Sequence, residues 1–198
     1  MQTELEAKFL NVDPDATRAK LRETGAELVH PERLMRRKSF DDSQGHLDRH
    51  RAWVRVRDEG DKITMSYKQS DEDTLHGTQE TVLTVDDFER ACAFLEEVGL
   101  VAKSYQETKR EKWMLDNVEI TIDTWPWLPT FVELEGHREE DLKSVAGSLG
   151  LEWSAAIHGG VTPVYKRYYD VTYDEVNSWP QIVFGPVPDW LERKRKKV

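Results

Sequence analysis

Charged side chains that alternate with apolar ones constrain the fold of this chain more than any other feature of its sequence. The alternation starts in Glu4-Leu5-Glu6-Ala7-Lys8, where a β-strand would place Glu4, Glu6 and Lys8 on one face. Such a strand does not suit a purely apolar core. It suits either an exposed outer face or an interior that holds divalent cations and phosphates, because magnesium takes oxygen ligands. The short motif alone leaves both alternatives open.

Several later segments show the same alternation of charged and apolar side chains. Arg55 and Arg57 flank Val56, and the stretches at residues 62–68 and 118–123 also carry charged or hydroxyl side chains at every second position. In a sandwich the apolar face points inward and the charged face points to water. A closed barrel with helices packed outside allows the opposite arrangement, in which the polar face lines a solvated lumen. Alternation does not decide between the two.

The predicted elements favour the barrel class. We expect about eight strands, mostly in hairpin-linked pairs, with few helices between them. After the first strand, further strands are predicted at residues 27–40, 53–57, 62–68, 79–85, 101–114, 118–123 and 130–135. Helices are predicted at residues 14–24, 86–98 with Asp86 as the N-cap, 139–149 and 162–169. The residues at 70–77 are predicted to form a loop.

Composition narrows the function classes. A chain of 198 residues with 38% apolar and 33% charged side chains is typical of one globular domain. The net charge of −10 argues against general nucleic-acid binding. Cys92 is the one cysteine, and its apolar neighbours predict a core residue. No run of about 18 apolar residues and no signal peptide is found, so we expect no membrane span and a cytoplasmic location.

An ordered set of motifs extends over most of the chain. The set comprises Glu4-x-Glu6-x-Lys8, Arg55-x-Arg57, Lys68, Glu80, Arg110, Asp123 and Phe131-Val132-Glu133-Leu134-Glu135-Gly136. In this order it resembles the CYTH family, also called triphosphate tunnel metalloenzymes, which includes class IV adenylyl cyclases, thiamine triphosphatases and inorganic triphosphatases. The resemblance implies an α+β, mainly β fold: an eight-stranded antiparallel β-barrel with helices packed outside. It covers residues 1–170 and leaves 171–198 as a C-terminal extension with a basic tail that we expect to be solvated.

The resemblance also implies a site. It assigns triphosphate binding to Lys8, Arg55, Arg57, Lys68 and Arg110. It assigns Mg²⁺ or Mn²⁺ to Glu4, Glu6, Glu80, Asp123, Glu133 and Glu135. Catalytic roles fall to Glu4, Glu6, Arg55 and Arg57. No Ser/His/Asp arrangement, metal-spaced Cys/His pair or glycine-rich phosphate loop competes with this site.

The chain departs from the family pattern in places. Members often have Lys-x-Arg where Thr108-Lys109-Arg110 stands here, so the lysine is lost or has moved to Lys109 on the opposite face. Trp125 and Trp127 stand where a glycine is common, and they are candidates to shape one mouth of the tunnel. The C-terminal Ser-Tyr of many members is replaced around Tyr165 and Lys166, whose roles stay open.

Three functions are compatible with these motifs. The first is a metal-dependent hydrolase of inorganic, nucleoside or thiamine triphosphate. The second is a class IV adenylyl cyclase that makes cyclic AMP and pyrophosphate from ATP. The third is a phosphate-compound binding protein without turnover. We expect a small-molecule triphosphate as the partner, no nucleic acid and no membrane, with a homodimer left open.

Overall fold

The computed structural model describes residues 2–70 and 78–197, and within them the side chains of residues 5–69 and 79–197. The predicted loop at residues 70–77 therefore lies almost entirely outside the described residues. Eight strands in the described part build the barrel. They are β1 (Gln2–Phe9), β2 (Glu27–Asp42), β3 (Ala52–Asp58), β4 (Ile63–Ser70), β5 (Thr78–Val85), β6 (Leu100–Leu115), β7 (Val118–Thr124) and β8 (Phe131–Gly136).

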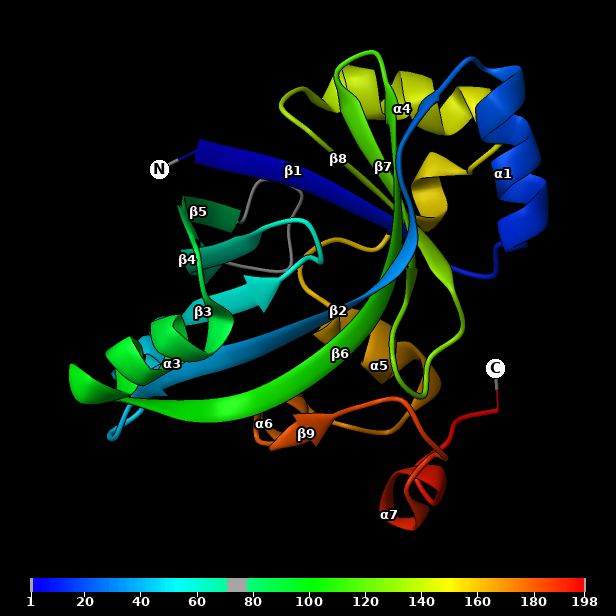
Figure 1. The fold of residues 1–198 in the computed structure, drawn as a ribbon. Coiled ribbons are helices and arrows are strands. Elements are labelled where there is room, and N and C mark those ends of the chain that lie inside the picture. Colours follow the sequence, from blue (N-terminus) through cyan, green and yellow to red (C-terminus); the bar gives the residue numbers. More distant parts are fainter. Residues whose placement is uncertain (1, 71–77, 198) are drawn as a thin grey trace.

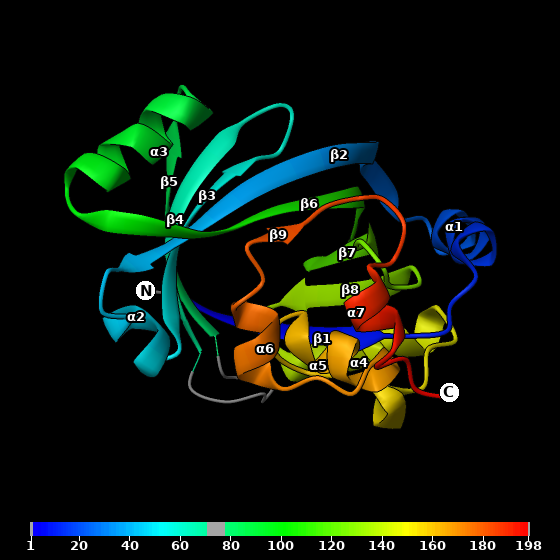
Figure 2. The ribbon, with the colours of Figure 1, turned by 90° about the horizontal axis from the view of Figure 1, so that it is seen from below.

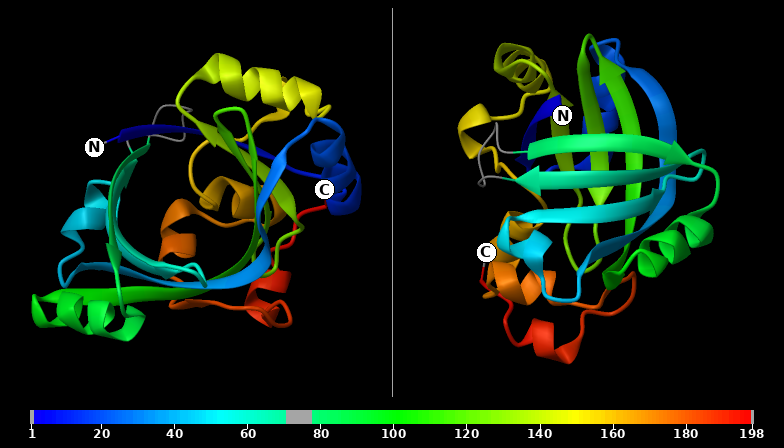
Figure 3. Two further views of the ribbon diagram at one scale, coloured as in Figure 1. Left: turned by 45° about the horizontal axis from the view of Figure 1, so that its top comes forward. Right: turned by 90° about the vertical axis from the view of Figure 1, so that its left-hand side faces the viewer.

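These strands close into a ring. The order is β2-β3-β4-β5-β1-β8-β7-β6, and β6 pairs back with β2, every pairing being antiparallel. Figure 3 shows the ring from one end and from the side. The β1–β5 seam is short, with three Cα pairs from Gln2↔Glu80 to Glu4↔Thr78, whereas β1 and β8 share five. A ninth strand, β9 (Gln181–Ile182), adds to β6 in parallel. The predicted eight-stranded antiparallel barrel is confirmed.

The longer helices pack on the outside of the ring (Figures 1 and 3). These are α1 (Pro14–Glu23), α3 (Phe88–Glu97) and α4 (Glu139–Ser148). Helix α1 begins as predicted, with the Asp13 carboxylate accepting from the N–H groups of Asp15 and Ala16 and with proline in the first turn. The predicted cap of α3 is wrong by one residue: Asp87, not Asp86, accepts from the Arg90 N–H. The cause is that Asp87 stands three residues before that N–H, the spacing an N-cap requires.

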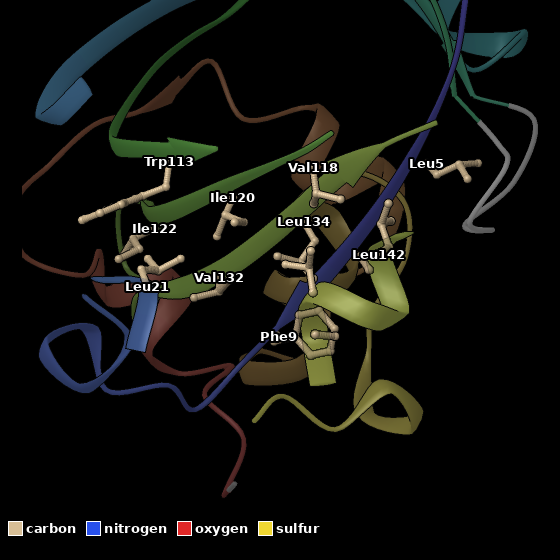
Figure 4. Packing of buried hydrophobic residues seen from close by; sticks show 13 residues of the cluster. Leu5, Phe9, Leu21, Trp113, Val118, Ile120, Ile122, Val132, Leu134 and Leu142 are labelled. Carbon is tan, nitrogen blue, oxygen red and sulfur yellow. The ribbon is translucent and has the colours of Figure 1, made fainter. Parts of the chain in front are cut away.

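The apolar core lies between the ring and these helices. Leu5 and Phe9 of β1, with alternate residues of β7 and β8, pack against Leu142 of α4 and Leu21 of α1 (Figure 4). A second cluster joins strands β2 and β3 to α3, and it holds Cys92, which is buried as predicted. Burying one large apolar side chain, such as a leucine or phenylalanine, contributes about 1.5–3 kcal/mol to folding. The apolar residues of each strand face the outer helices, so the charged residues that alternate with them face the lumen.

The chain after α4 forms a third cluster beside the barrel. It contains the short helices α5 (Thr162–Tyr168), α6 (Tyr173–Asn177) and α7 (Asp189–Glu192). The short helix η1 (Trp153–Ala155) packs against the first cluster instead, and α2 (His46–Arg49) connects β2 to β3 in the chain. Figure 2 shows α5, α6 and α7 gathered on one side of the barrel. Trp127 packs here against Trp179 and Trp190, away from the lumen. The cluster includes Tyr165, whose hydroxyl donates to the Pro126 carbonyl at 2.9 Å.

The C-terminal extension is bound to the rest of the chain. The Ser104 hydroxyl donates to the Trp179 carbonyl at 2.8 Å, and the Tyr105 N–H donates to the Pro180 carbonyl at 2.9 Å. Most residues of the basic tail are exposed, as expected, while Lys194 pairs with Glu175 and the Lys196 N–H donates to the Tyr168 carbonyl. Among the described helices, none has the length and apolar character needed to cross a membrane.

Candidate active site

The lumen of the barrel is a cavity of about 390 Å³ lined by side chains from all eight strands of the ring. This volume is in the range of small-molecule sites. The predicted residues that line it are Glu6, Lys8, Arg55, Arg57, Lys68, Glu80, Arg110, Glu133 and Glu135. The side chain of Glu4 lies outside the described residues. The structure therefore brings together residues that are up to 129 positions apart in the chain, from Glu6 to Glu135.

Lys8 lies between two carboxylates. Its ammonium is 3.1 Å from Glu6 Oε2 and 3.0 Å from Glu133 Oε2, and it also donates to the Gly159 carbonyl. Burial by itself would lower the pKa of Lys8, but Glu133 and Glu6 outweigh burial and raise that pKa above its ordinary value. Burial would raise the pKa of Glu133, but Lys8 and Arg110 lower it to about 2. Lys8 and Glu133 are therefore both charged at neutral pH.

Arg110 is fixed by two acidic side chains. Its guanidinium forms a bidentate ion pair with Asp123, with Nε 2.7 Å from Oδ1, and its Nη2 lies 3.3 Å from Glu133 Oε1. Burial opposes the charge, yet Asp123 and Glu133 raise the pKa of Arg110 well above its ordinary value. Asp123 is almost fully buried behind Arg110, so in this structure it orients an arginine that faces the cavity.

The cations of β3 and β4 have acidic partners of their own. Glu80 accepts from Arg55 Nη2 at 3.2 Å and from Lys68 Nζ at 2.9 Å. Arg57 reaches Glu59 through Nε at 3.0 Å and Nη2 at 2.6 Å. Burial would raise the pKa of Glu59, but Arg57 lowers it to about 2. Glu59 was missed from the sequence because it reads as part of a polar hairpin turn, and no signal in the turn marks it as buried.

Arg37 of β2 was also missed. It is 6% exposed, lines the cavity, and donates from Nη2 to Thr108 Oγ1 at 2.7 Å. Its guanidinium carbon lies 4.7 Å from the ring centroid of Trp125, which lines the cavity as predicted. Thr108 occupies the inward position where the family resemblance suggests a lysine, and Lys109 points away toward Phe184. A guanidinium from the neighbouring strand therefore lies beside the position of the lost lysine.

Charge is distributed unequally around the cavity. The carboxylates of Glu6, Glu119, Glu133 and Glu135 come from β1, β7 and β8, whereas β2 and β3 contribute Arg37, Arg55 and Arg57. We call these the acidic wall and the basic wall. The Nε atoms of Arg37 and Arg55 are buried and have no hydrogen-bond partner. Buried donors are nearly always satisfied in folded proteins by protein groups, water or a ligand, so an acceptor such as a phosphate oxygen would fit beside these two atoms.

The acidic wall has the donor chemistry of a divalent-metal site. Glu6 and Glu135 are Cα partners across β1 and β8, and carboxylate oxygens are the ligands that Mg²⁺ and Mn²⁺ prefer. Among the described side chains, those of residues 5–69 and 79–197, however, no three Asp, Glu, His or Cys side chains converge as a ready-made metal site. Glu133 is engaged by Lys8 and Arg110, and Glu80 by Arg55 and Lys68. Metal binding would exchange part of these ion pairs for metal ligation.

Two further residues named from the sequence lie away from the cavity. Tyr165 is fully buried in the C-terminal cluster, and Lys166 is exposed with its carbonyl bonded to the Lys196 ammonium at 2.8 Å. Neither lines the cavity. The position of Tyr165 indicates a structural role, because it packs in the cluster that holds Trp125 and bonds to the Pro126 carbonyl.

Comparisons with known proteins agree with this architecture. A family model described as the CYTH domain matches residues 2–151. No curated protein sequence matches the chain. A proposed adenylate cyclase from Vibrio parahaemolyticus has a similar structure, with a TM-score of 0.71 and 16% identity over 83% of this chain and 98% of that one.

Two more solved structures share the fold. A conserved hypothetical protein from Pyrococcus furiosus aligns with a TM-score of 0.66 and 18% identity, covering 82% of this chain and 99% of that one. A proposed adenylyl cyclase from Hippeastrum, described as having a dominant triphosphatase activity, aligns with a TM-score of 0.55 and 13% identity over 89% and 95%. At these identities the likeness establishes the fold alone.

Proposed function

The chain belongs to the CYTH domain family, and from this membership and the charges of the cavity we propose that it is a divalent-metal-dependent triphosphatase. The family includes triphosphatases and adenylyl cyclases, and its tunnel enzymes generally depend on a divalent metal. The proposed substrate is an inorganic, nucleoside or thiamine triphosphate held inside the barrel. Water attacks the terminal phosphorus, the bond to the bridging oxygen breaks, and the products are phosphate and the corresponding diphosphate.

The opposition of the two walls is the observation that carries this proposal. A triphosphate needs cations on its oxygens, and a metal ion bound to it needs carboxylates on its other side. The basic wall and the acidic wall supply these two environments within one cavity. Phosphoryl transfer is catalysed mainly by positioning and by neutralising charge, and the cavity provides both without a covalent nucleophile.

Each predicted residue has a role in this scheme. Arg55, Arg57 and Arg110 bind phosphate oxygens through planar forks, and Lys68 adds a further cation. Lys8 stays protonated at neutral pH because its pKa is raised, so it acts as a fixed cation and not as a base. The proposed metal ligands are Glu4, Glu6, Glu133 and Glu135, joined less directly by Glu80 and Asp123. When bound, the ion would neutralise phosphate charge and favour deprotonation of the attacking water.

Adenylyl cyclase activity is the second candidate. Trp53, Tyr173 and Asn177 also line the cavity, and they are candidates to contact an organic group attached to the phosphates. In that reaction the ribose 3′-hydroxyl attacks the α-phosphorus, and pyrophosphate leaves. The basic wall would serve either reaction, because both place the same triphosphate among the same arginines.

Product analysis distinguishes the candidates. The protein is incubated with inorganic triphosphate, ATP and thiamine triphosphate, each with Mg²⁺ or Mn²⁺, and phosphate, pyrophosphate and cyclic AMP are measured. We expect ADP and phosphate from ATP and turnover of inorganic triphosphate. Cyclic AMP and pyrophosphate, with inorganic triphosphate inert, would replace the proposal with the cyclase. Binding without any turnover would indicate the third function, a phosphate-compound binding protein.

Metal dependence is tested on the same reaction. Chelation with EDTA should abolish turnover, and Glu135→Gln should reduce it strongly, because the amide keeps the shape of the side chain but loses a charged oxygen ligand. The melting temperature of the variant should stay near that of the wild type. Glu97→Gln on the exposed outer helix α3 is the control and should leave turnover unchanged. Full activity in excess EDTA would contradict metal dependence.

A further inference from the structure

Arg37 is a buried cation without an acidic partner. In the part of the chain that the structure describes, ion pairs with carboxylates hold Lys8, Arg55, Arg57, Lys68 and Arg110, but none involves Arg37. Arg37 donates a hydrogen bond to the Thr108 hydroxyl, which carries no charge, and the Arg37 Nε has no acceptor. A buried charge without compensation is costly, so a ligand is expected to supply the missing anion.

The strand register makes this cost larger. Arg37 and Arg57 are direct Cα partners across β2 and β3, and Arg55 follows opposite Ser39 two positions along. Like charges directly opposite each other destabilise a sheet. Burial and the nearby charges of Arg55, Arg57 and Arg110 lower the pKa of Arg37 well below its ordinary value, and the carboxylate of Asp123, which pairs with Arg110, offsets them only in part. An anion between these side chains would remove the repulsion.

The surroundings of Arg37 also fix its direction. The Trp125 ring packs against the guanidinium at 4.7 Å, a cation–π contact, and the Thr108 hydroxyl holds Nη2 at 2.7 Å. Trp125 is itself 7% exposed and anchored in the C-terminal cluster. A side chain held in this way loses little conformational entropy when it binds a ligand.

We infer that Arg37 and Arg57 together clamp one phosphate group of the substrate from the basic wall, opposite the carboxylates. The ligand class is a phosphate group of a polyphosphate chain, because two planar forks side by side match tetrahedral phosphate oxygens. The identity of this ligand as a triphosphate rests on the proposed function. The clamp itself is defined by the two arginines and their register.

The test measures binding and stability separately. Arg37→Met keeps the volume of the side chain and removes its charge. The affinity for inorganic tripolyphosphate, measured by titration calorimetry in EDTA, should fall on the order of 10- to 100-fold. The melting temperature of the ligand-free variant should stay equal or rise, because an uncompensated buried charge is removed. A purely structural role would lower the melting temperature instead.

Two matched variants sharpen the result. Arg36→Met changes the preceding residue of β2, which points outward to Asp58 and Glu89, and should leave the affinity unchanged. Thr108→Lys in the Arg37→Met background places an ammonium beside the vacated position, since Thr108 Oγ1 is 2.7 Å from Arg37 Nη2. This double variant should recover part of the lost affinity.

The outcomes separate this inference from the proposed function. Unchanged tripolyphosphate affinity in Arg37→Met, with turnover by the wild type intact, overturns the clamp and leaves the triphosphatase. Arg37-dependent binding by a wild type that turns over no triphosphate supports the clamp and overturns the triphosphatase. A wild type that binds no tripolyphosphate, either in EDTA or with Mg²⁺, overturns both.

Discussion

At the scale of single residues, most of the charged side chains of the cavity are ion-paired with one another. Glu59 shows this most directly, since both Nε and Nη2 of Arg57 donate to its Oε1. The pair directs the guanidinium of Arg57 before any ligand binds. A preorganised donor of this kind stabilises a charged transition state without reorganising at the moment of reaction.

Glu59 should make stability depend on pH. Its pKa is lowered from 4.5 to about 2 in the folded state, so its contribution is fully present above pH 4.5 and is lost as the pH falls toward 2. At pH 7, Glu59→Gln should therefore lower the free energy of unfolding by on the order of 1–3 kcal/mol. Urea unfolding at pH 7, 4.5 and 3 measures the difference, which should shrink at the lowest pH. A gap that stays constant over this range would contradict the ion pair.

Arg57 should matter for turnover in addition to its ion pair with Glu59. Arg57→Ala removes a preorganised cation, and we expect a loss of about 2–4 kcal/mol of transition-state stabilisation, seen as a lower kcat/KM. The loss should be similar for inorganic triphosphate and ATP if the cavity reads only the phosphates. Steady-state kinetics on both substrates measure it, with Arg36→Ala as the outward-facing control. A loss confined to ATP would show that Arg57 contacts the nucleoside instead.

At the scale of elements, strand parity explains which parts of the site the sequence predicts. In β3, β4 and β8 alternation is regular, and Arg55, Lys68 and Glu133 face the cavity as predicted. In β2 the register shifts at three places, between Leu28 and His30, His30 and Arg33, and Ser39 and Phe40. Each shift can exchange inner and outer faces, so counting along this strand does not reveal that Arg37 points inward.

The C-terminal elements were harder to predict for a different reason. The basic tail resembles a solvated segment by composition alone. Its attachment depends on acceptors that are distant in sequence, such as the carbonyl of Tyr168 and the carboxylate of Glu175. The division at residue 170 remains a prediction, while the family model ends at residue 151.

Helix α3 offers a test of the corrected cap. Asp87→Ala should lower the free energy of unfolding by about 1 kcal/mol, because the Arg90 N–H loses its acceptor. Asp86→Ala, one residue earlier, is the matched control and should change it much less. Thermal or urea unfolding of both variants measures the difference. The reverse order would mean that Asp86 is the cap after all.

At the scale of the whole molecule, the closed ring confines many charges of both signs in one cavity. Most of these charges are paired in the ligand-free protein, and a bound triphosphate with its metal would add to that pairing. A ligand that binds only the folded state stabilises it by mass action, by about 2.7 kcal/mol at a concentration 100 times its dissociation constant.

Thermal shift measures this whole-molecule effect. Inorganic tripolyphosphate with Mg²⁺ should raise the melting temperature, and a non-hydrolysable triphosphate analogue should do so without being consumed. Sulfate at the same ionic strength is the control for general screening, and its shift should be smaller. The absence of any shift at saturating tripolyphosphate would count against a triphosphate site in this barrel.

The strand order also affects how the chain folds during its synthesis. Strand β1 is synthesised first, yet its neighbours in the ring are β5 and β8, and β8 begins only at Phe131. While the ribosome builds the intervening hundred or so residues, β1 has a free edge and the half-assembled lumen exposes its arginines without their acidic wall. Pairing across such sequence distances is slow compared with local contacts. We therefore expect the barrel to close late, after β8 has been synthesised, and the cavity to form only at that stage.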